Sequence, residues 1–396
     1  VTAFSQHPLK DPVDAVQIRY ARSQPVIAYT LRVDETDLSS FYVEMRIRNV
    51  RDTFHVAMMA HPEYDDRYWR YVEDMSVETK NGRGNIFRED SALWRIAAHG
   101  DEVTIRYKIH LPPPPQGQRP AWLPFLSPTG GLVGGPHSFM YVLGATLAPS
   151  HITLQLPQGW ISATGLEPTA DPATFFVPSA AILMDAPILI GHFKTWQFSV
   201  DQVPHRVVYW SLPNAVMFDP PKLVSYLQAF VQQCKILFGR LPYREYSFLL
   251  QDGAYGALEH QNSVTLGLPS SQFAGDVAGY FNEIAHEYFH SWNLVRIRPA
   301  EQGAITYKTP PPSRGLWWSE CLTLYYADLL TRREGLPVPD STRVKHLEGL
   351  MERYYSSPSN MHISAEKVSL ASDAPPGVLG DYTASTHLQG ELFGAM

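Results

Sequence analysis

The stretch "HEYFHSWNLVRIRP", residues 286–299, decides how the second half of this chain is interpreted. His286 and His290 are four residues apart, so on a helix their side chains lie on one face, one turn apart. No Gly or Pro interrupts residues 280–294, so a helix can run through the motif. Two imidazoles in this arrangement can bind one Zn²⁺, while Glu287 points to the side and can take a proton from a metal-bound water. The motif therefore predicts a catalytic zinc site.

A catalytic zinc site needs a third protein ligand and keeps one position open. The segment 315–330, "GLWWSECLTLYYADLL", predicts a helix that places Glu320 thirty residues after His290. Trp317 and its apolar neighbours give this helix a surface to pack against the first. Two histidines and a glutamate form a set typical of hydrolytic zinc sites. Cys321 lies about 100° round the helix from Glu320 and is expected to be a packing residue.

The first two hundred residues predict a different kind of structure. Apolar and polar residues alternate with a period of two, the pattern of half-buried strands, in segments 26–33, 41–50 and 103–111. Segments 152–157 and 207–212 are similar in composition and are also expected to be strands. The simplest arrangement of such strands is an antiparallel β-sandwich. Residues 111–136 are so rich in Pro and Gly that we expect a long surface loop there.

The pattern changes near residue 215. Asp219 is placed to cap a helix that Gly239 would end, and residues 246–251 predict a strand. Two more helices are expected, from about residue 277 through the metal motif and from about 316 to 333. The second half is therefore α+β, with helices dominant.

These patterns together predict an α+β multidomain protein. An N-terminal antiparallel β-sandwich in residues 1–205 would be followed by a mainly helical zinc-peptidase domain in residues 206–396. The final residues, from 386 on, predict a helix without a stop signal, so we expect the chain to continue beyond them.

Composition excludes several classes of protein. The net charge of -7 gives no basic surface for nucleic acid, and two cysteines cannot form a disulfide framework. The most apolar stretch, residues 180–193, is interrupted by Asp185 and is too short to span a bilayer. The sequence begins with Val1 rather than Met, so earlier removal of a leader peptide stays open. Both a cytoplasmic and an exported location are compatible with the sequence. The oligomeric state also stays open.

Three segments carry a resemblance to a known family. "GALEHQNS" at 256–263, "HEYFHSWNLVRIRP" and then "LWWSECLTLYYADLL" resemble the glycyl aminopeptidase family of gluzincin zinc metallopeptidases. This resemblance implies an N-terminal β-domain, a thermolysin-like catalytic domain and usually a C-terminal PDZ domain, which is not expected within residues 1–396. It implies one Zn²⁺ held by His286, His290 and Glu320, with Glu287 as the catalytic carboxylate.

The resemblance also implies how a substrate binds. Glu259 matches the residue that binds the free α-ammonium group of a peptide, an interaction that a carboxylate makes well. Gly256 and Ala257 would pair with the substrate backbone as an added strand. The implied substrates are peptides with a free N-terminus and a small first residue, Gly or Ala.

This sequence departs from the family pattern near its end. Relatives carry a Ser-Tyr-Tyr-x-Lys-Gly run where this chain has "STHLQG" at 385–390. A tyrosine from that region would donate a hydrogen bond to the tetrahedral oxyanion, and here Tyr382 and His387 are the candidates. Glu283 and Asp328 are candidates for orienting the zinc-binding histidines.

Two alternatives to an aminopeptidase stay open. A zinc endopeptidase on the same scaffold would ignore the free N-terminus and would not need Glu259. A peptide-binding relative would keep the zinc architecture after losing the oxyanion tyrosine. The presence of Glu287 argues against the second alternative, because a structural zinc site has no use for a general base.

Overall fold

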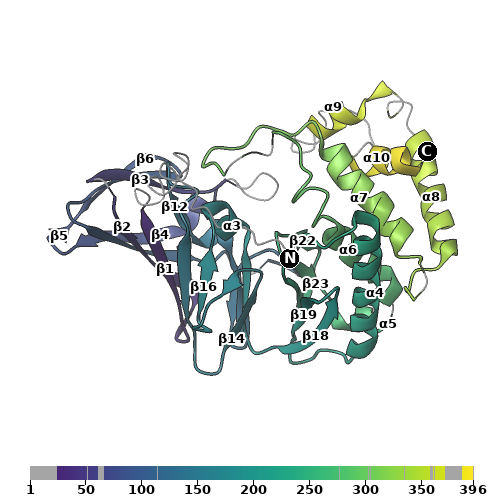
Figure 1. Ribbon diagram of the computed structural model, residues 1–396, viewed down its shortest axis with the longest axis horizontal. Coiled ribbons are helices and arrows are strands. Elements are labelled where there is room, and N and C mark those ends of the chain that lie inside the picture. Colours follow the sequence, from purple (N-terminus) through teal and green to yellow (C-terminus); the bar gives the residue numbers. More distant parts are fainter. Residues whose placement is uncertain are drawn as a thin grey trace, which may run out of the picture.

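The computed structural model describes residues 25–50, 52–60, 67–113, 115–275, 277–301, 303, 305–333, 335–356, 360, 362–370 and 386–395, with the backbone alone for 278 and 386–390. The molecule is elongated, with a β-rich half at one end and helices at the other (Figure 1). This arrangement confirms the predicted α+β class, with an antiparallel-rich β region first and a helical part last.

The N-terminal half is built on an eight-stranded sheet in the order β15-β16-β13-β1-β2-β8-β4-β5. Its strands are β1 (Val26–Asp34), β2 (Asp37–Arg48), β4 (Val72–Thr79), β5 (Gly82–Arg83), β8 (Glu102–His110), β13 (Ser150–Gln155), β15 (Glu167–Pro168) and β16 (Thr174–Val177). Along β1, β2 and β8 buried residues alternate with more exposed ones, as the period of two predicts. One pair, β1 with β13, is parallel, so the sheet is not wholly antiparallel.

Two four-stranded sheets complete the N-terminal half. One has the order β12-β3-β7-β6 and the other β10-β11-β17-β14. Their strands are β3 (Thr53–Met58), β6 (Asn85–Asp90), β7 (Leu93–Ala97), β10 (Phe125–Ser127), β11 (Gly130–Gly134), β12 (Met140–Val142), β14 (Ile161–Thr164) and β17 (Pro187–Gly191). Short helices η1 (Tyr68–Tyr71), α2 (Gly135–Ser138) and α3 (Ala180–Asp185) lie between strands.

The prediction of a surface loop over residues 111–136 is wrong in its second half. That segment contains β10, buried β11 and the start of α2. Its glycines allow backbones to pack closely: a Cβ on Gly131 would lie 2.4 Å from the carbonyl oxygen of Phe125. Glycine here permits tight strand contact rather than preventing regular structure.

A five-stranded sheet in the order β18-β19-β20-β23-β22 forms the base of the helical half. Its strands are β18 (Lys194–Val200), β19 (Val203–Trp210), β20 (Tyr246–Gln251), β22 (Ala257–Glu259) and β23 (Ser263–Gly267). β19, β20 and β23 are parallel, and β22 pairs antiparallel with β23 at the edge. The sheet begins before residue 205, and the boundary placed there stays a prediction.

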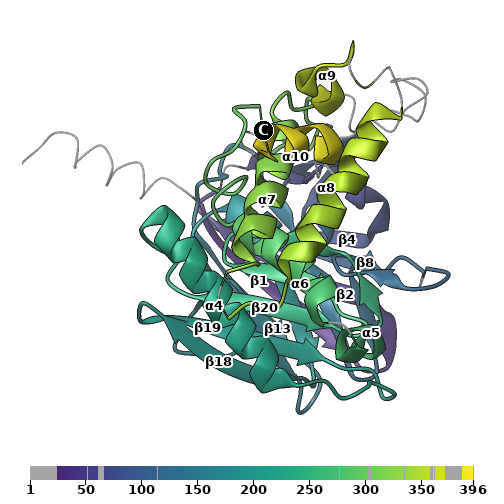
Figure 2. The same cartoon turned by 90° about the vertical axis from the view of Figure 1, so that its right-hand side faces the viewer.

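The helices of this half are α4 (Pro220–Phe238), α5 (Ser270–Gly275), α6 (Val277–Phe289), α7 (Leu316–Leu330), α8 (Asp340–Tyr355), α9 (Ala365–Leu370) and α10 (Thr386–Ala395). Asp219 caps α4 by accepting a hydrogen bond of 3.0 Å from the Lys222 amide, and Gly239 ends it with φ 80°. α7, α8 and α10 lie together on the outer side, with α6 nearer the sheet (Figure 2). Among the described helices, none is long and apolar enough to cross a membrane.

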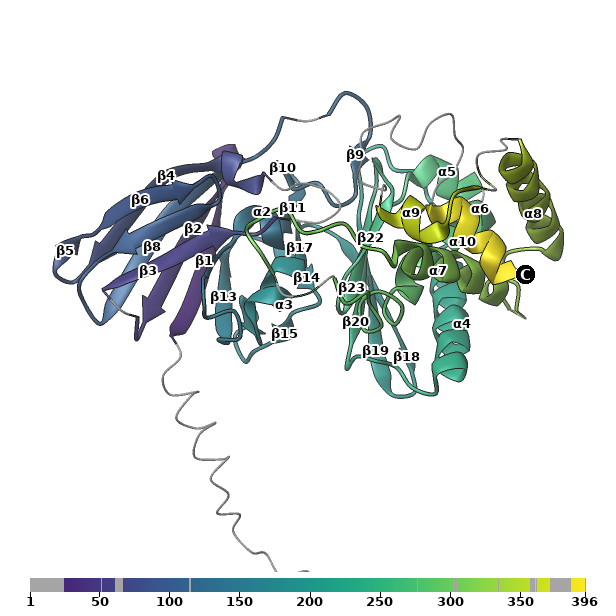
Figure 3. The ribbon, with the colours of Figure 1, turned by 90° about the horizontal axis from the view of Figure 1, so that it is seen from above.

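The two halves meet through a small apolar core. Leu132, Ala163 and Leu189 from the β10-β11-β17-β14 sheet pack against Val208, Trp210 and Leu249 of β19 and β20. Figure 3 shows this sheet between the large N-terminal sheet and the sheet of the helical half. The strands β9 (Arg119–Pro120) and β21 (Ala254–Tyr255) also pair across this junction. The N-terminal half therefore lies directly against the strands that lead to α6, the helix that carries the His-Glu-x-x-His motif.

Candidate active site

The metal motif lies at the C-terminal end of α6, and its three predicted ligands converge. The Nε2 atoms of His286 and His290 are 3.0 Å apart, and Glu320 Oε2 lies 3.4 Å from each of them. Tetrahedral zinc with bonds of about 2.05 Å separates its ligand atoms by about 3.3 Å. The spacing of the three side chains thus fits one zinc ion.

The site is buried and negatively charged. His286 is 9% exposed and His290 1% exposed. Burial alone lowers the pKa of His290, but the carboxylate of Glu320, with smaller contributions from two other carboxylates, raises it well above its usual value. Such a potential favours a positive charge between the imidazoles, which a divalent cation supplies.

His290 is oriented by Asn293, a residue that the sequence analysis missed. His290 Nδ1 lies 2.7 Å from the Asn293 carbonyl oxygen, so Nδ1 carries the proton and Nε2 keeps a lone pair for a metal. The next residue, Leu294, has φ 113°, a strained value for a non-glycine, and its amide donates to Ile297 O at 2.8 Å. The Asn293–Leu294 peptide unit is therefore held at both ends.

The side chain of Asn293 holds the helix that carries Glu320. Its amide nitrogen lies 3.2 Å from Trp318 O, 3.0 Å from Ser319 O and 3.1 Å from Thr323 Oγ1. At the other end of the helix pair, Thr331 donates a 3.0 Å hydrogen bond to Asn282 Oδ1. α6 and α7 are thus joined at both ends, which sets the position of Glu320 relative to the histidines. In the sequence, the one feature that could have indicated this role of Asn293 is its position three residues after the second histidine.

The opposite face of α6 is fixed by buried hydroxyl groups. Tyr288 and Tyr243 share a hydrogen bond, and Tyr243 contacts His205 Nε2 at 2.9 Å. Burial lowers the pKa of His205 to about 4, so its imidazole is neutral at physiological pH. These contacts fix the metal helix on the sheet.

Glu259 and Glu287 come together beside the histidines. The ligand atoms of Glu259, Glu287 and His290 all lie within 4.8 Å of one another. Glu259 is the last residue of β22, and this edge strand contacts α6. The position preceding β22 requires glycine, because Gly256 has φ 70° and a Cβ there would lie 2.8 Å from Trp122.

The other predicted site residues have different outcomes. Tyr382 lies outside the described residues. His387 lies in α10, where the structure describes the backbone of that residue but not its side chain. Asp328 forms an ion pair with Arg343 of α8. Burial raises the pKa of Glu283. At His290 Nδ1, the hydrogen-bond partner is the backbone carbonyl of Asn293 and not Glu283 or Asp328.

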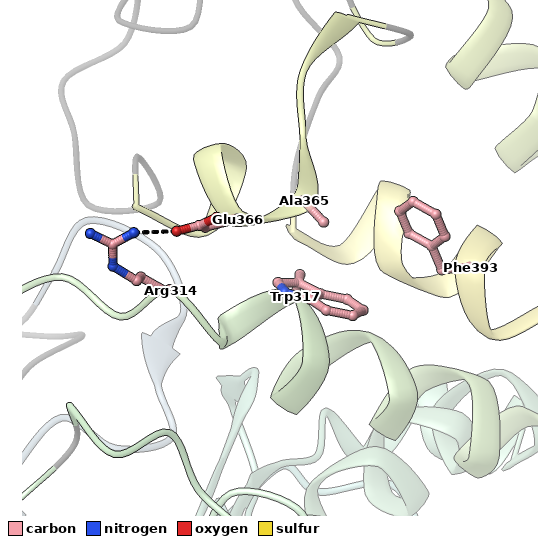
Figure 4. A pocket seen from close by; sticks show the side chains of 5 residues that line it. All are labelled: Arg314, Trp317, Ala365, Glu366 and Phe393. Carbon is pink, nitrogen blue, oxygen red and sulfur yellow. Dashed lines mark hydrogen bonds and ion pairs between the residues drawn. The ribbon is translucent and has the colours of Figure 1, made fainter.

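A separate pocket of about 350 Å³ lies where α7, α9 and α10 meet (Figure 4). The rings of Trp317 and Phe393 line it, with centroids 6.0 Å apart, and Arg314 pairs with Glu366 at its rim. Its lining residues include none of the converging metal-site groups. This pocket is therefore separate from the candidate active site around His286 and His290.

Solved structures with the same fold include peptidases. An aminopeptidase N family protein from Idiomarina loihiensis is 20% identical, with a TM-score of 0.81 over 93% of this chain. This chain spans 65% of the length of that structure. The M1 zinc metallopeptidase from Deinococcus radiodurans is 12% identical, with a TM-score of 0.52, and the match covers 93% of this chain and 80% of that one. A variant of the Deinococcus enzyme was solved with a Tyr-Ser-Ala substrate. No curated protein sequence matches this chain significantly.

Two family models match the sequence itself. The peptidase M61 N-terminal domain matches residues 28–192, and the M61 glycyl aminopeptidase domain matches residues 280–388. Together the two matches cover more than half of the chain, and the second includes the three converging metal-site residues. The chain belongs to the M61 glycyl aminopeptidase family.

Proposed function

We propose that this chain is a zinc-dependent aminopeptidase that removes small N-terminal residues, Gly or Ala, from peptides. The observation that carries the proposal is the position of Glu259, whose carboxylate lies within 4.8 Å of the ligand atoms of Glu287 and His290. One zinc ion per chain would be held by His286, His290 and Glu320.

The position of Glu259 limits the substrate length on the N-terminal side. Standard bond lengths place the amine nitrogen of a residue about 2.5 Å from its own carbonyl carbon. An ammonium–carboxylate hydrogen bond adds about 2.8 Å, so a carboxylate that binds this ammonium lies within about 5 Å of the scissile carbon. Glu259 has a ligand atom within 4.8 Å of ligand atoms of Glu287 and His290, the proposed base and a proposed zinc ligand. This short separation supports cleavage after the first residue of a peptide whose ammonium group is bound by Glu259.

Glu287 is the proposed general base. The chemistry supplied by bound zinc is polarisation of the scissile carbonyl and a lower pKa for the attacking water. Glu287 lies beside the histidines, so it can accept the proton of that water and return it to the leaving amine. Tyr382 and His387 remain the proposed donors to the oxyanion.

The β22 strand is the proposed binding edge for the substrate backbone. Within the described sheet, β22 pairs with β23 alone, which leaves its other edge for a peptide in extended form. Ala257 begins this strand and Gly256 directly precedes it, and the ring of Trp122 fills the space beside Gly256.

The test compares a Gly-Ala-containing peptide with its N-acetylated twin. We expect cleavage of the free peptide, abolished by a chelator, and at least tenfold slower cleavage of the acetylated peptide, because Glu259 has no cation to bind. Glu259→Gln should lower kcat/KM for the free peptide and reduce the discrimination. Glu348→Gln is the control, because Glu348 is exposed on α8. Equal cleavage of both peptides would favour the endopeptidase alternative. Peptide binding without any cleavage would favour the peptide-binding relative.

A further inference from the structure

We propose that Asp185 and Arg296 are positioning residues that set the distance between Glu259 and the metal site by holding the turn at residues 260–262 from two sides. This proposal rests on the proposed role of Glu259. The turn directly follows β22, so any shift of its backbone moves the Glu259 carboxylate.

Asp185 holds the turn from the N-terminal half. It is the last residue of α3, and its Oδ2 accepts a 2.7 Å hydrogen bond from the Gln261 amide. Its Oδ1 lies 3.6 Å from Nδ1 of His260, a residue that is 8% exposed. This contact explains why a carboxylate interrupts the most apolar stretch of the sequence.

Arg296 holds the turn from the metal-binding segment. Its Nη1 donates to Gln261 O at 2.9 Å and to Ser291 O at 2.8 Å. Its Nη2 lies 3.3 Å from Asn262 Oδ1. Ser291 follows the second histidine directly, so one guanidinium group joins the turn to the end of the metal helix. The planar arrangement of donors suits arginine, and a lysine cannot reproduce it.

The turn has little room to move in other directions. Asn262 O accepts a 3.0 Å hydrogen bond from the Ser247 amide of β20. A Cβ on Gly165, at the end of β14, would lie 3.1 Å from atoms of Asn262. The turn is therefore packed between the two halves of the molecule, and its contacts fix where β22 ends.

A small displacement of Glu259 would matter because binding groups act only at the right distance. A misplacement of about 1 Å by a remote change can cost about a hundredfold in rate. Loss of one turn contact is expected to shift the carboxylate by less, so we expect a roughly tenfold effect on free peptides. The N-terminal half would thus influence amine recognition without contacting the substrate.

The experiment measures kcat and KM for a free peptide and its N-acetylated twin, together with zinc content. Asp185→Ala should raise KM for the free peptide and lower the free-to-acetylated ratio of kcat/KM about tenfold, with zinc content unchanged. Asp185→Asn keeps an oxygen acceptor for the Gln261 amide and should restore the ratio. Asp171→Ala is the matched control, since Asp171 accepts a backbone hydrogen bond elsewhere in the N-terminal half.

Arg296→Ala should reproduce the loss, and Arg298→Ala, at an exposed position two residues further on, should not. An unchanged ratio in Asp185→Ala and Arg296→Ala, beside a wild type that discriminates, would overturn the inference alone. A wild type that cleaves both peptides equally would overturn the proposed function and the inference with it. If the wild type does not cleave, the Asp185 and Arg296 substitutions are made in the Glu287→Gln variant. Calorimetry then measures the ratio of the affinities for the free and the acetylated peptide. If Arg296→Ala fails to fold, the two Asp185 variants decide.

Discussion

Replacing Asn293 with alanine should weaken metal binding, although Asn293 is not itself a ligand. The backbone carbonyl that orients His290 remains in this variant. The amide group that holds the first turn of α7 is lost, and with it the contacts to Trp318 O, Ser319 O and Thr323 Oγ1. The position of Glu320 relative to the histidines then depends on weaker packing.

The size of the effect follows from the number of hydrogen bonds. An amide nitrogen has two protons to share among these three acceptors. Each net hydrogen bond contributes about 0.5–1.5 kcal/mol, so the loss is about 1–3 kcal/mol. If this free energy appears in metal binding, zinc affinity falls about five- to a hundredfold, since 1.4 kcal/mol corresponds to tenfold. Loss of comparable outer contacts costs about 10–100-fold in other metal sites.

Asn293→Asp provides a sharper test because aspartate has the same shape. The substitution places a carboxylate oxygen next to oxygen atoms that accept hydrogen bonds from Asn293 in the wild type. Two of these are helix carbonyls, so the contact becomes repulsive in a site where Asn293 is 6% exposed. We expect the aspartate variant to lose more zinc affinity than the alanine variant.

Zinc affinity is measured by competition with a chelator, and the free energy of unfolding of the metal-free protein by urea denaturation. Asn282→Ala is the control, because Asn282 joins the same two helices at their far ends. It should lower the free energy of unfolding and leave zinc affinity within about threefold of wild type. Aspartate and alanine variants with equal zinc affinity would refute the assigned orientation of the amide. Wild-type affinity in both would refute the positioning role.

Three further predictions concern the same half of the molecule. Glu287→Gln should bind zinc normally and lower kcat about 10²–10⁴-fold, the usual contribution of a general base, as measured by steady-state kinetics and zinc content. A chelator should lower the thermal midpoint of the wild type but not of the double variant His286→Ala/His290→Ala, because bound metal stabilises the folded state alone. A hydrogen bond to Glu391 raises the pKa of His346, so its stabilisation is present below about pH 6.5 and is lost as the pH rises through the folded pKa. The stability difference between wild type and His346→Gln should therefore shrink as the pH rises above about 6.5, and a constant difference would contradict this assignment.

The proposed metal ligands could be identified from the sequence because their arrangement depends on local geometry. His286 and His290 share one helix face for any α-helix through that segment, and α6 has this form. Glu320 required a second helix with an apolar surface, and its apolar residues indicated α7. Strands with alternating residues were found for the same reason, since side chains in a strand repeat every two positions.

Where composition alone was used, the prediction partly failed. Residues 111–136 were expected to form a loop because they are rich in Pro and Gly, yet β11 is a buried strand within them. Glycine has two opposite uses, in turns and at close backbone contacts, and only the neighbouring chain distinguishes them. The parallel pairing of β1 with β13 was missed for a similar reason, since alternation does not specify a partner strand.

By itself, the sequence determined the His-Glu-x-x-His pattern, with Glu287 as the proposed general base, and the general class of both halves. The tertiary structure alone decided which residues place those groups. Asp185 contacts a residue 76 positions away, Arg296 one 35 positions away, and Asn293 a helix 26 positions further on. Sequence periodicity reports contacts within one helix or strand, where neighbouring positions follow from backbone geometry. Contacts between distant segments depend on how the whole core packs, and no local pattern records them.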